Sequence, residues 1–217
     1  ATARLVSLDL VPIIAYFAGD VQSYLALGRW RPPLPEACTR CGTRSALVGH
    51  GSYLRYVAEE SPWLQIAIPR FRCRACGHTF GILPSFLAPR RHYSACLIQR
   101  VLSLREQLGL SRHQLSVPFH GMPALSTCLA WIRAFGANAQ LWLNALLSVL
   151  TRFDPGYDPL RSLVSPVGLA PGPPRLLLDM LPALLAALGI TPAGPSLSHG
   201  LGLLLLWGQN RRLPRLV

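Results

Sequence analysis

Two cysteine pairs carry the residue types and spacing that chemistry requires. Cys38 and Cys41 are separated by two residues, Cys73 and Cys76 are separated in the same way, and a glycine follows each pair. A gap of two residues lets both thiolates of a pair face one ion, and the glycine permits a tight turn with backbone N–H groups directed at sulfur. Structural zinc sites use four such ligands in a tetrahedron. We therefore predict one structural Zn²⁺ held by these four cysteines.

The 31 residues between the pairs fit a long hairpin that returns the chain to the first pair. The alternative is a redox-active dithiol, but that motif holds one pair at the start of a helix, and the flanks here resemble strands. His50 and His78 compete as ligands and are interpreted as polar neighbours. Cys96 and Cys128 fall on apolar helical faces and are predicted core residues. Four sulfur ligands leave no open position, so the zinc is predicted to be structural rather than catalytic.

Arginine occupies every second position of the segment PRFRCRACGH, residues 69–78. On a strand, Phe71 and Cys73 would face inward, and the arginines between and beside them would face outward at a spacing of about 6.6 Å. Such a row of charge would follow the phosphates of a nucleic acid. The alternative is a charged strand edge that prevents aggregation. The row consists of Arg70, Arg72 and Arg74.

The whole chain is basic, with a net charge of +12 from 21 basic and nine acidic residues, and every basic residue is arginine. Such a charge attracts polyanions, either nucleic acid or an anionic membrane, although a solubility surface without a partner is the simpler alternative. Residues 38–93 hold eight arginines against Glu59 and Glu60, a net +6. Beyond the row, the predicted nucleic-acid contacts in this segment are Arg40, Arg44, Arg55, Arg90 and Arg91.

The predicted elements place the cysteines on a hairpin followed by helices. Strands are expected at 52–58 and 63–73, with a third beginning at 79. A short helix is expected after Asp20 as N-cap. A longer helix is expected after Ser94, with an apolar stripe of Cys96, Leu97, Val101, Leu104 and Leu108 and with Gly109 at its C-cap.

The segment after this helix has the order of a helix-turn-helix. One helix would begin at Ser111, a second near Pro123, and a third would run from about 137. Pro118 would shorten or kink the first of these helices. The alternative is a helical bundle with no role in DNA binding. The residues predicted to meet DNA here are Arg112, Ser126, Thr127 and Arg133.

We predict an α+β fold that is mostly α. It combines a small β-hairpin zinc ribbon, a helix-turn-helix bundle and C-terminal apolar helices. The predicted divisions are 1–37 as a helical lead-in with a Pro-rich connector, 38–93 as the ribbon, 94–153 as the bundle, 154–174 as a Pro/Gly linker, and 175–217 as apolar helices with a basic tail.

The motifs CTRCG, PRFRCRACGHTF and GLSRHQLS…GMPALSTCLAWI, taken together, resemble the transposase-like zinc-ribbon and helix-turn-helix proteins of bacterial insertion sequences and other mobile elements. The resemblance covers about residues 38–135. It implies that the ribbon and helices bind the DNA of the element, that the four cysteines hold the metal, and that Ser126, Thr127 and Arg133 belong to the recognition helix.

Catalysis is not expected. Full transposases hold two metal ions with three carboxylates, and here only Asp154, Asp158 and Asp179 follow the DNA-binding segment. The first two lie in a Pro/Gly-rich stretch and are interpreted as turn residues. The absence of lysine also excludes a phosphate-binding loop with its lysine.

We therefore predict a non-catalytic, zinc-dependent protein of a mobile element that binds double-stranded DNA in the bacterial cytoplasm, associated with the nucleoid. Further expected partners are other proteins of a transposition complex and a second copy of the chain. No membrane segment or signal peptide is expected. The alternatives are a protein-interaction adaptor, an RNA-binding subunit in which Tyr53, Tyr56 and Trp63 stack on bases, and a peripheral membrane protein that uses residues 176–207.

Overall fold

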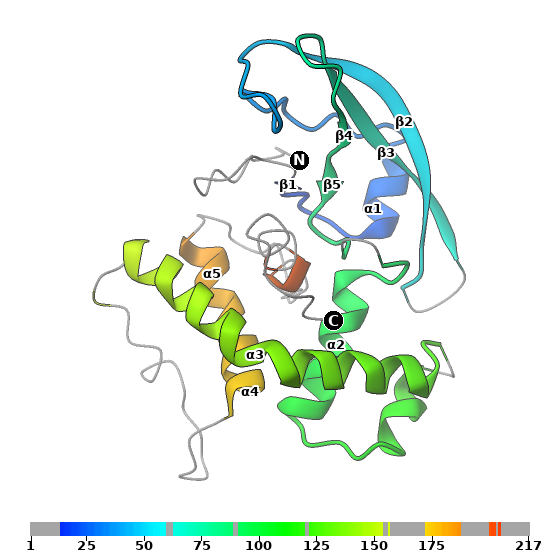
Figure 1. The fold of residues 1–217 in the computed structure, drawn as a ribbon. Helices are drawn as coiled ribbons and strands as arrows, with labels where there is room; N and C mark the ends of the chain where they lie inside the picture. Colours follow the sequence, from blue (N-terminus) through cyan, green and yellow to red (C-terminus); the bar gives the residue numbers. More distant parts are fainter. Residues whose placement is uncertain are drawn as a thin grey trace.

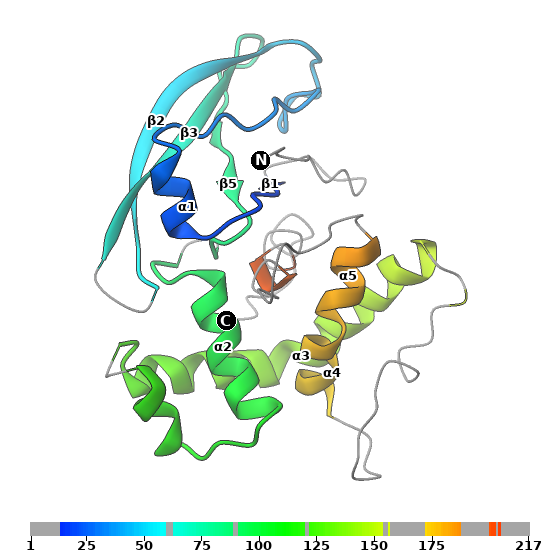
Figure 2. The ribbon, with the colours of Figure 1, turned by 180° about the vertical axis from the view of Figure 1, so that it is seen from behind.

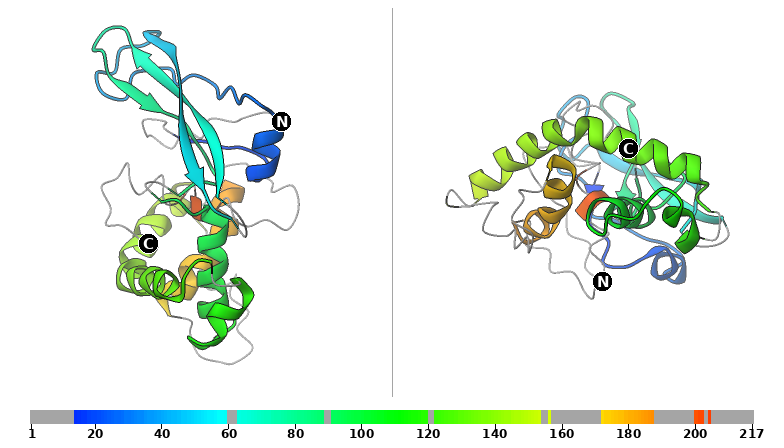
Figure 3. Two further views of the ribbon diagram at one scale, coloured as in Figure 1. Left: turned by 90° about the vertical axis from the view of Figure 1, so that its right-hand side faces the viewer. Right: turned by 90° about the horizontal axis from the view of Figure 1, so that it is seen from below.

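The computed structural model describes residues 14–59, 63–88, 91–119, 122–153, 156, 172–187, 200–202 and 204. A β-rich half and a helical half lie one above the other (Figures 1 and 3). The predicted α+β class is confirmed. The elements are β1 (Ile14–Ala15), α1 (Val21–Ala26), β2 (Leu47–Val57), β3 (Leu64–Cys73), β4 (Thr79–Gly81), β5 (Leu83–Pro84), α2 (Ala95–Glu106), the 3₁₀ helix η1 (Gln114–Phe119), α3 (Leu125–Phe153), α4 (Pro173–Asp179) and α5 (Leu181–Ala187).

The predicted hairpin is confirmed as β2 and β3, which pair antiparallel, with β4 added as the third strand. β2 begins five residues earlier than predicted, at Leu47 rather than at Ser52. A register shift lies between Gly49 and Ser52, where one extra residue bulges from β2. Gly51 has a φ of +73° there, a conformation that glycine adopts without strain.

The buried face of β3 changes sides opposite this bulge. Ile66 and Ile68 are buried in the first half of the strand, whereas Phe71 and Cys73 are buried in the second half. Since side chains alternate between faces, Ile66 and Ile68 are buried on one face of the strand, called here the inner face, and Phe71 and Cys73 are buried on the other. The outer face of the first half, which carries Gln65, is left exposed to solvent.

The N-terminal segment completes the core beneath the hairpin. β1 pairs parallel with β5, and α1 begins at Val21, directly after Asp20, whose carboxylate accepts a hydrogen bond from the Ser23 N–H at 2.8 Å. α1 lies beside the hairpin (Figure 2). Asp20 is thus the N-cap that the sequence predicts.

Four aromatic rings fill the space between this segment and the sheet. Phe17 and Tyr24 each lie edge-on to Trp30 and to Phe86, with ring centroids 5.5–5.9 Å apart. Edge-to-face pairs of this kind contribute about 0.5–1.5 kcal/mol beyond the area they bury. Buried residues of the segment 15–30 therefore share one hydrophobic core with the sheet.

α2 confirms the helix predicted after Ser94, whose hydroxyl accepts a hydrogen bond from the Leu97 N–H at 3.1 Å. Leu97 and Val101 are buried as predicted, and Gly109 has the left-handed φ of +69° that follows many helices. Leu108 departs from the predicted stripe, because the helix ends at Glu106 and leaves that side chain 68% exposed.

The predicted second and third helices of the bundle are one helix, α3, of 29 residues. Gly136 lies inside it, where glycine costs about 1 kcal/mol relative to alanine. The apolar face on either side of it, which includes Phe135, Ala139 and Trp142, is buried against α2 and α4, and this burial outweighs the cost. The helix predicted from Ser111 is instead the short 3₁₀ helix η1, with Pro118 inside it.

The first helix of the predicted C-terminal apolar segment forms two helices, α4 and α5. The break precedes Pro182, which has no N–H to continue the helix. Both helices pack on α3, and residues 200–202 form a helical turn against Ser85 and Ala95. None of the helices in the described part of the chain is both long and apolar enough to cross a bilayer.

Candidate metal centre and the basic surface beside it

The two cysteine pairs lie in turns with the same hydrogen bonds. The Cys38 N–H donates to the Thr43 carbonyl at 3.0 Å, and the Gly42 N–H donates to the Cys38 carbonyl at 2.9 Å. The second pair repeats both bonds, from Cys73 to the His78 carbonyl at 2.8 Å and from the following glycine to Cys73 at 2.9 Å. Both glycines have positive φ, +71° and +70°. Each turn thus points its two thiols to one side.

The four sulfur atoms converge where the two turns meet. The Sγ atoms of Cys38 and Cys76 are 3.7 Å apart, those of Cys41 and Cys73 are 3.7 Å apart, and all four lie within 4.8 Å of one another. A tetrahedron of sulfurs at about 2.3 Å from a central Zn²⁺ has edges of about 3.8 Å. These separations therefore fit a four-thiolate metal site, and the fold brings the four predicted cysteines together.

Local hydrogen bonds divide the thiols by acidity. The Thr43 hydroxyl, 3.2 Å from Cys41 Sγ, and the Thr43 N–H lower the pKa of Cys41 to about 6. Backbone N–H groups of Cys41 and Arg40 lower the pKa of Cys38. The His78 N–H also favours the Cys76 thiolate, but burial and the three neighbouring thiols outweigh it and raise its pKa to about 11. Four thiolates at this distance therefore need a cation among them.

The two histidines near the pairs do not join the site. The clustered ligand groups found in the described part of the chain are the four cysteines. His50 is exposed on β2, and the ring of His78 stacks on Phe80 with centroids 6.0 Å apart. Both fit the predicted role of polar neighbours. With four thiols converging, the arrangement has the donor set of a structural site.

The metal site lies at the end of the β2–β3 hairpin, where the loops before β2 and after β3 come together (Figure 1). The Arg74 N–H donates to the Ala46 carbonyl at 2.8 Å and joins these loops. Two cysteines are buried, Cys38 at 3% and Cys73 at 0% exposed. We call the surface around this end the basic tip, defined by the exposed side chains of Arg40, Arg44, Arg72 and Arg74.

The arginine row is oriented largely as predicted. Phe71 and Cys73 are buried, and Arg72 and Arg74 are exposed. Arg70 is half-buried, with one guanidinium nitrogen 3.5 Å from the Thr79 hydroxyl. The exposed arginines of this row are thus the two that lie next to Cys73 in the sequence.

Arg55 is predicted to contact nucleic acid, but its side chain points beneath the sheet instead of into solvent. It pairs with Ile66, so it points to the inner face, and its guanidinium donates to the carbonyls of Ala88 and Arg91. Burial lowers the pKa of Arg55, while Tyr53 opposes that shift. Its hydrogen-bonding capacity is directed at the backbone beneath the sheet. Arg91 is half-buried, and Arg90 lies outside the described residues.

The predicted recognition residues lie in the helical half. Ser126 and Arg133 are exposed on α3, Thr127 is half-buried, and Arg112 is exposed just before η1. α3 lies at the opposite end of the molecule from the basic tip (Figures 1 and 3). The structure therefore does not bring these residues together with the tip arginines on one compact surface.

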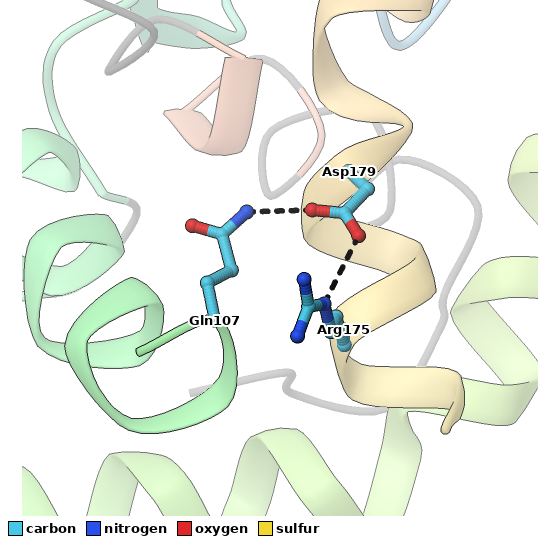
Figure 4. Close-up of polar contacts among 3 residues, drawn as sticks. All are labelled: Gln107, Arg175 and Asp179. Carbon is cyan, nitrogen blue, oxygen red and sulfur yellow. Dashed lines mark hydrogen bonds and ion pairs between the residues drawn. The ribbon is translucent and has the colours of Figure 1, made fainter. Parts of the chain in front are cut away.

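Of the three carboxylates that follow the predicted DNA-binding segment, Asp179 is the one that lies among the described residues. Asp179 accepts a hydrogen bond from the Gln107 amide at 2.6 Å and lies 3.5 Å from the Arg175 guanidinium (Figure 4). The hydrogen bond from Gln107 joins α4 to the end of α2, whereas the ion pair with Arg175 lies within α4. Asp154 and Asp158 lie outside the described residues.

One residue of the site was missed by the sequence reasoning. Thr43, directly after the first CxxCG motif, donates to a thiol, and its position next to Gly42 is the signal that could have indicated it.

Residues 38–115 match a family model described as a domain of unknown function (DUF6431). The match includes both cysteine pairs, the hairpin and α2, and ends within η1 before α3 begins. No curated protein and no solved structure matches the chain. The resemblance to transposase-like proteins stays a prediction.

Proposed function

We propose that residues 38–93 are a zinc ribbon whose metal holds the basic tip in a fixed shape for binding duplex DNA. The observation that carries this proposal is the convergence of four thiols, with two Sγ–Sγ separations of 3.7 Å, in turns whose neighbouring arginines are exposed. A structural zinc site fixes its ligand loops, so the charges on those loops are held in place without further packing. Preorganised cations lose less entropy when they meet phosphates.

The tip offers several unshielded cations on one end of the molecule. Arg40 and Arg44 come from the first cysteine turn and the segment after it, and Arg72 and Arg74 come from the end of β3 and the second turn. Arg72 and Arg74 are two residues apart where β3 passes into the second turn, and both are exposed, so their charges are available to neighbouring phosphates. Contacts of this kind give affinity without sequence preference. Base reading would then come from Ser126, Thr127 and Arg133 on α3 in a second contact.

The proposed role is non-catalytic, and its biological setting in a mobile element follows only from the sequence resemblance. A protein-interaction adaptor and an RNA-binding subunit are the alternatives to this proposal. The family match spans the proposed ribbon together with α2 and names no partner.

The salt dependence of duplex binding tests the proposal. If four tip arginines each neutralise one phosphate, the logarithm of affinity falls against the logarithm of salt with a slope of about −3.6. Arg72→Ala should weaken binding to all duplexes alike and reduce that slope by about one. Arg105→Ala, an exposed arginine of α2 in the helical half, is the matched control and should change neither quantity. A flat salt response would favour the adaptor.

Metal dependence provides the second test. Cys73→Ser removes a buried ligand and should abolish both zinc retention and duplex binding. Removal of zinc from the unaltered protein by a chelator should have the same effect, and added Zn²⁺ should restore binding. Zinc-free protein with full duplex affinity would contradict the proposal.

A further inference from the structure

The exposed outer face of the hairpin carries large uncharged side chains. Leu54 pairs with Ala67 and Tyr56 pairs with Gln65, so these four side chains share one face. Leu54 is 63% exposed and Tyr56 is 53% exposed. The named side chains of this face carry no charge, in contrast to the basic tip at the other end of the same hairpin.

Trp63 extends this face at the start of β3. It lies two residues before Gln65, on the side to which Gln65 points, and is 44% exposed. Its ring centroid is 5.8 Å from that of His92 and 5.7 Å from that of Tyr93. Tyr93 in turn lies edge-on to Trp131 of α3 at 5.1 Å. We call Tyr56, Trp63 and His92 the aromatic row.

Contacts with the rest of the protein hold Trp63 and His92 of the aromatic row in place, although both residues are exposed to solvent. The backbone of residues 92–94 is hydrogen-bonded to Ala58 at the end of β2, at 2.7 and 3.0 Å, which fixes His92 beside the sheet. Trp63 is held by ring contacts that reach the helical core through Tyr93. The Trp63 ring is positioned by these contacts while the residue stays 44% exposed, and a ring positioned in this way can stack on a flat partner at little entropic cost.

We infer that the aromatic row stacks on the unpaired bases of a DNA strand. This inference rests on the proposed function, because it gives the partner of the basic tip a single-stranded portion. Bases offer flat π faces to aromatic rings, but a duplex hides those faces, so the row adds nothing to the binding of fully paired DNA. A second copy of the chain is a poorer occupant, since each copy carries a charge of +12.

The spacing along β3 defines the form of DNA that engages both surfaces. Arg72 at the tip and Trp63 at the row are separated by nine residues, about 30 Å of strand. This length corresponds to about nine base pairs of duplex at 3.4 Å per pair. By the alternation along β3, Arg72 has the parity of Ile66 and Trp63 has that of Gln65, so the two side chains point to opposite faces of the strand. A duplex bound at the tip would therefore have to continue as an unpaired strand that bends around the edge of the hairpin to reach the row.

Three probes and matched variants test the inference on the full zinc-loaded chain. The probes are a blunt duplex, the same duplex with a single-stranded thymidine overhang, and that overhang made of uridine RNA. We expect the DNA overhang to increase affinity by about 5- to 100-fold through one stacked base or more. Tyr56→Ala should remove most of this gain and leave blunt-duplex affinity unchanged. Tyr56→Phe, which keeps the ring, should retain the gain, as should Leu54→Ala on the same face.

Several results would overturn the inference. The first is equal affinity for the blunt and the overhanging duplex. The second is a loss of affinity in Tyr56→Ala that is equal on both probes, or a loss in Tyr56→Phe as large as that in Tyr56→Ala. The third is a more than tenfold preference for the RNA overhang, and the fourth is a dimer in sedimentation that Tyr56→Ala dissociates. Failure of the proposed function is recognised separately, because blunt-duplex binding would then be insensitive to salt and to Arg72→Ala.

Discussion

Arg55 and Arg72 lie on the same hairpin, but their replacement by alanine should affect different properties. Arg55→Ala should lower the stability of the fold, and Arg72→Ala should lower the affinity for duplex DNA. The Arg55 guanidinium donates to the carbonyls of Ala88 and Arg91 beneath the sheet. A buried carbonyl that loses its donor costs about 1–3 kcal/mol, so two of them set an upper range of about 2–6 kcal/mol. The variant no longer has to bury a charged guanidinium group, and the free energy saved in this way offsets part of the loss. We expect Arg55→Ala to lower the free energy of unfolding by about 2–4 kcal/mol.

Equilibrium unfolding in urea, on zinc-loaded protein, measures this loss as a shift of the midpoint at unchanged slope. Arg72→Ala is the control: its side chain is exposed, so stability should change by less than about 0.5 kcal/mol while duplex affinity falls. Arg55→Lys should recover part of the loss, because an ammonium group can donate to one or both carbonyls without the fork geometry. An Arg55→Ala protein as stable as its parent would refute the structural role given to Arg55.

Three further predictions concern stability. Gly202→Ala places a Cβ 1.8 Å from the Ser85 carbonyl oxygen, so it should displace the turn that buries Leu201. We expect the free energy of unfolding in urea to fall by about 2–3 kcal/mol. An unchanged urea midpoint would contradict this packing. Gly136→Ala meets no atom within 4 Å inside α3 and should raise stability by about 1 kcal/mol, with a loss of stability as the opposing result. Burial and the nearby Asp20 raise the pKa of Glu59, although a hydrogen bond with Ser94 opposes them. The folded state then holds this proton more tightly than the unfolded state, so stability falls as pH rises from the ordinary glutamate pKa of about 4.3 to the raised value. Glu59→Gln should remove this fall in thermal unfolding midpoints measured from pH 4 to 7, and identical pH profiles for the two proteins would exclude it.

The parts of the fold that the sequence predicts correctly depend on local chemistry. Two CxxCG motifs specify their turns through glycine and backbone hydrogen bonds, and the N-caps Asp20 and Ser94 each bond to a residue three positions later. Alternation within β3 likewise predicts that Phe71 is buried. Each of these signals is contained in a few consecutive residues, so no knowledge of distant partners is needed.

The parts that the sequence does not predict depend on distant contacts. The Phe17 N–H lies 3.2 Å from the Ser85 hydroxyl, 68 residues away, and no local pattern indicates this pairing of the N-terminal segment with the sheet. Gly136 indicates a helix boundary locally, but burial of the α3 face on both sides of it keeps the helix continuous. Arg55 reads as a surface cation because the carbonyls that bind it come from residues 88 and 91.

Zinc-edge X-ray absorption on protein purified without added metal tests the central claim most directly. It should be combined with a measurement of zinc per chain after extended dialysis. The convergence of the Sγ atoms of Cys38, Cys41, Cys73 and Cys76 predicts one zinc per chain, with four sulfur neighbours at about 2.3 Å and no nitrogen or oxygen in the first shell. A folded chain without tightly held metal, or a first shell that contains nitrogen or oxygen, would contradict the account.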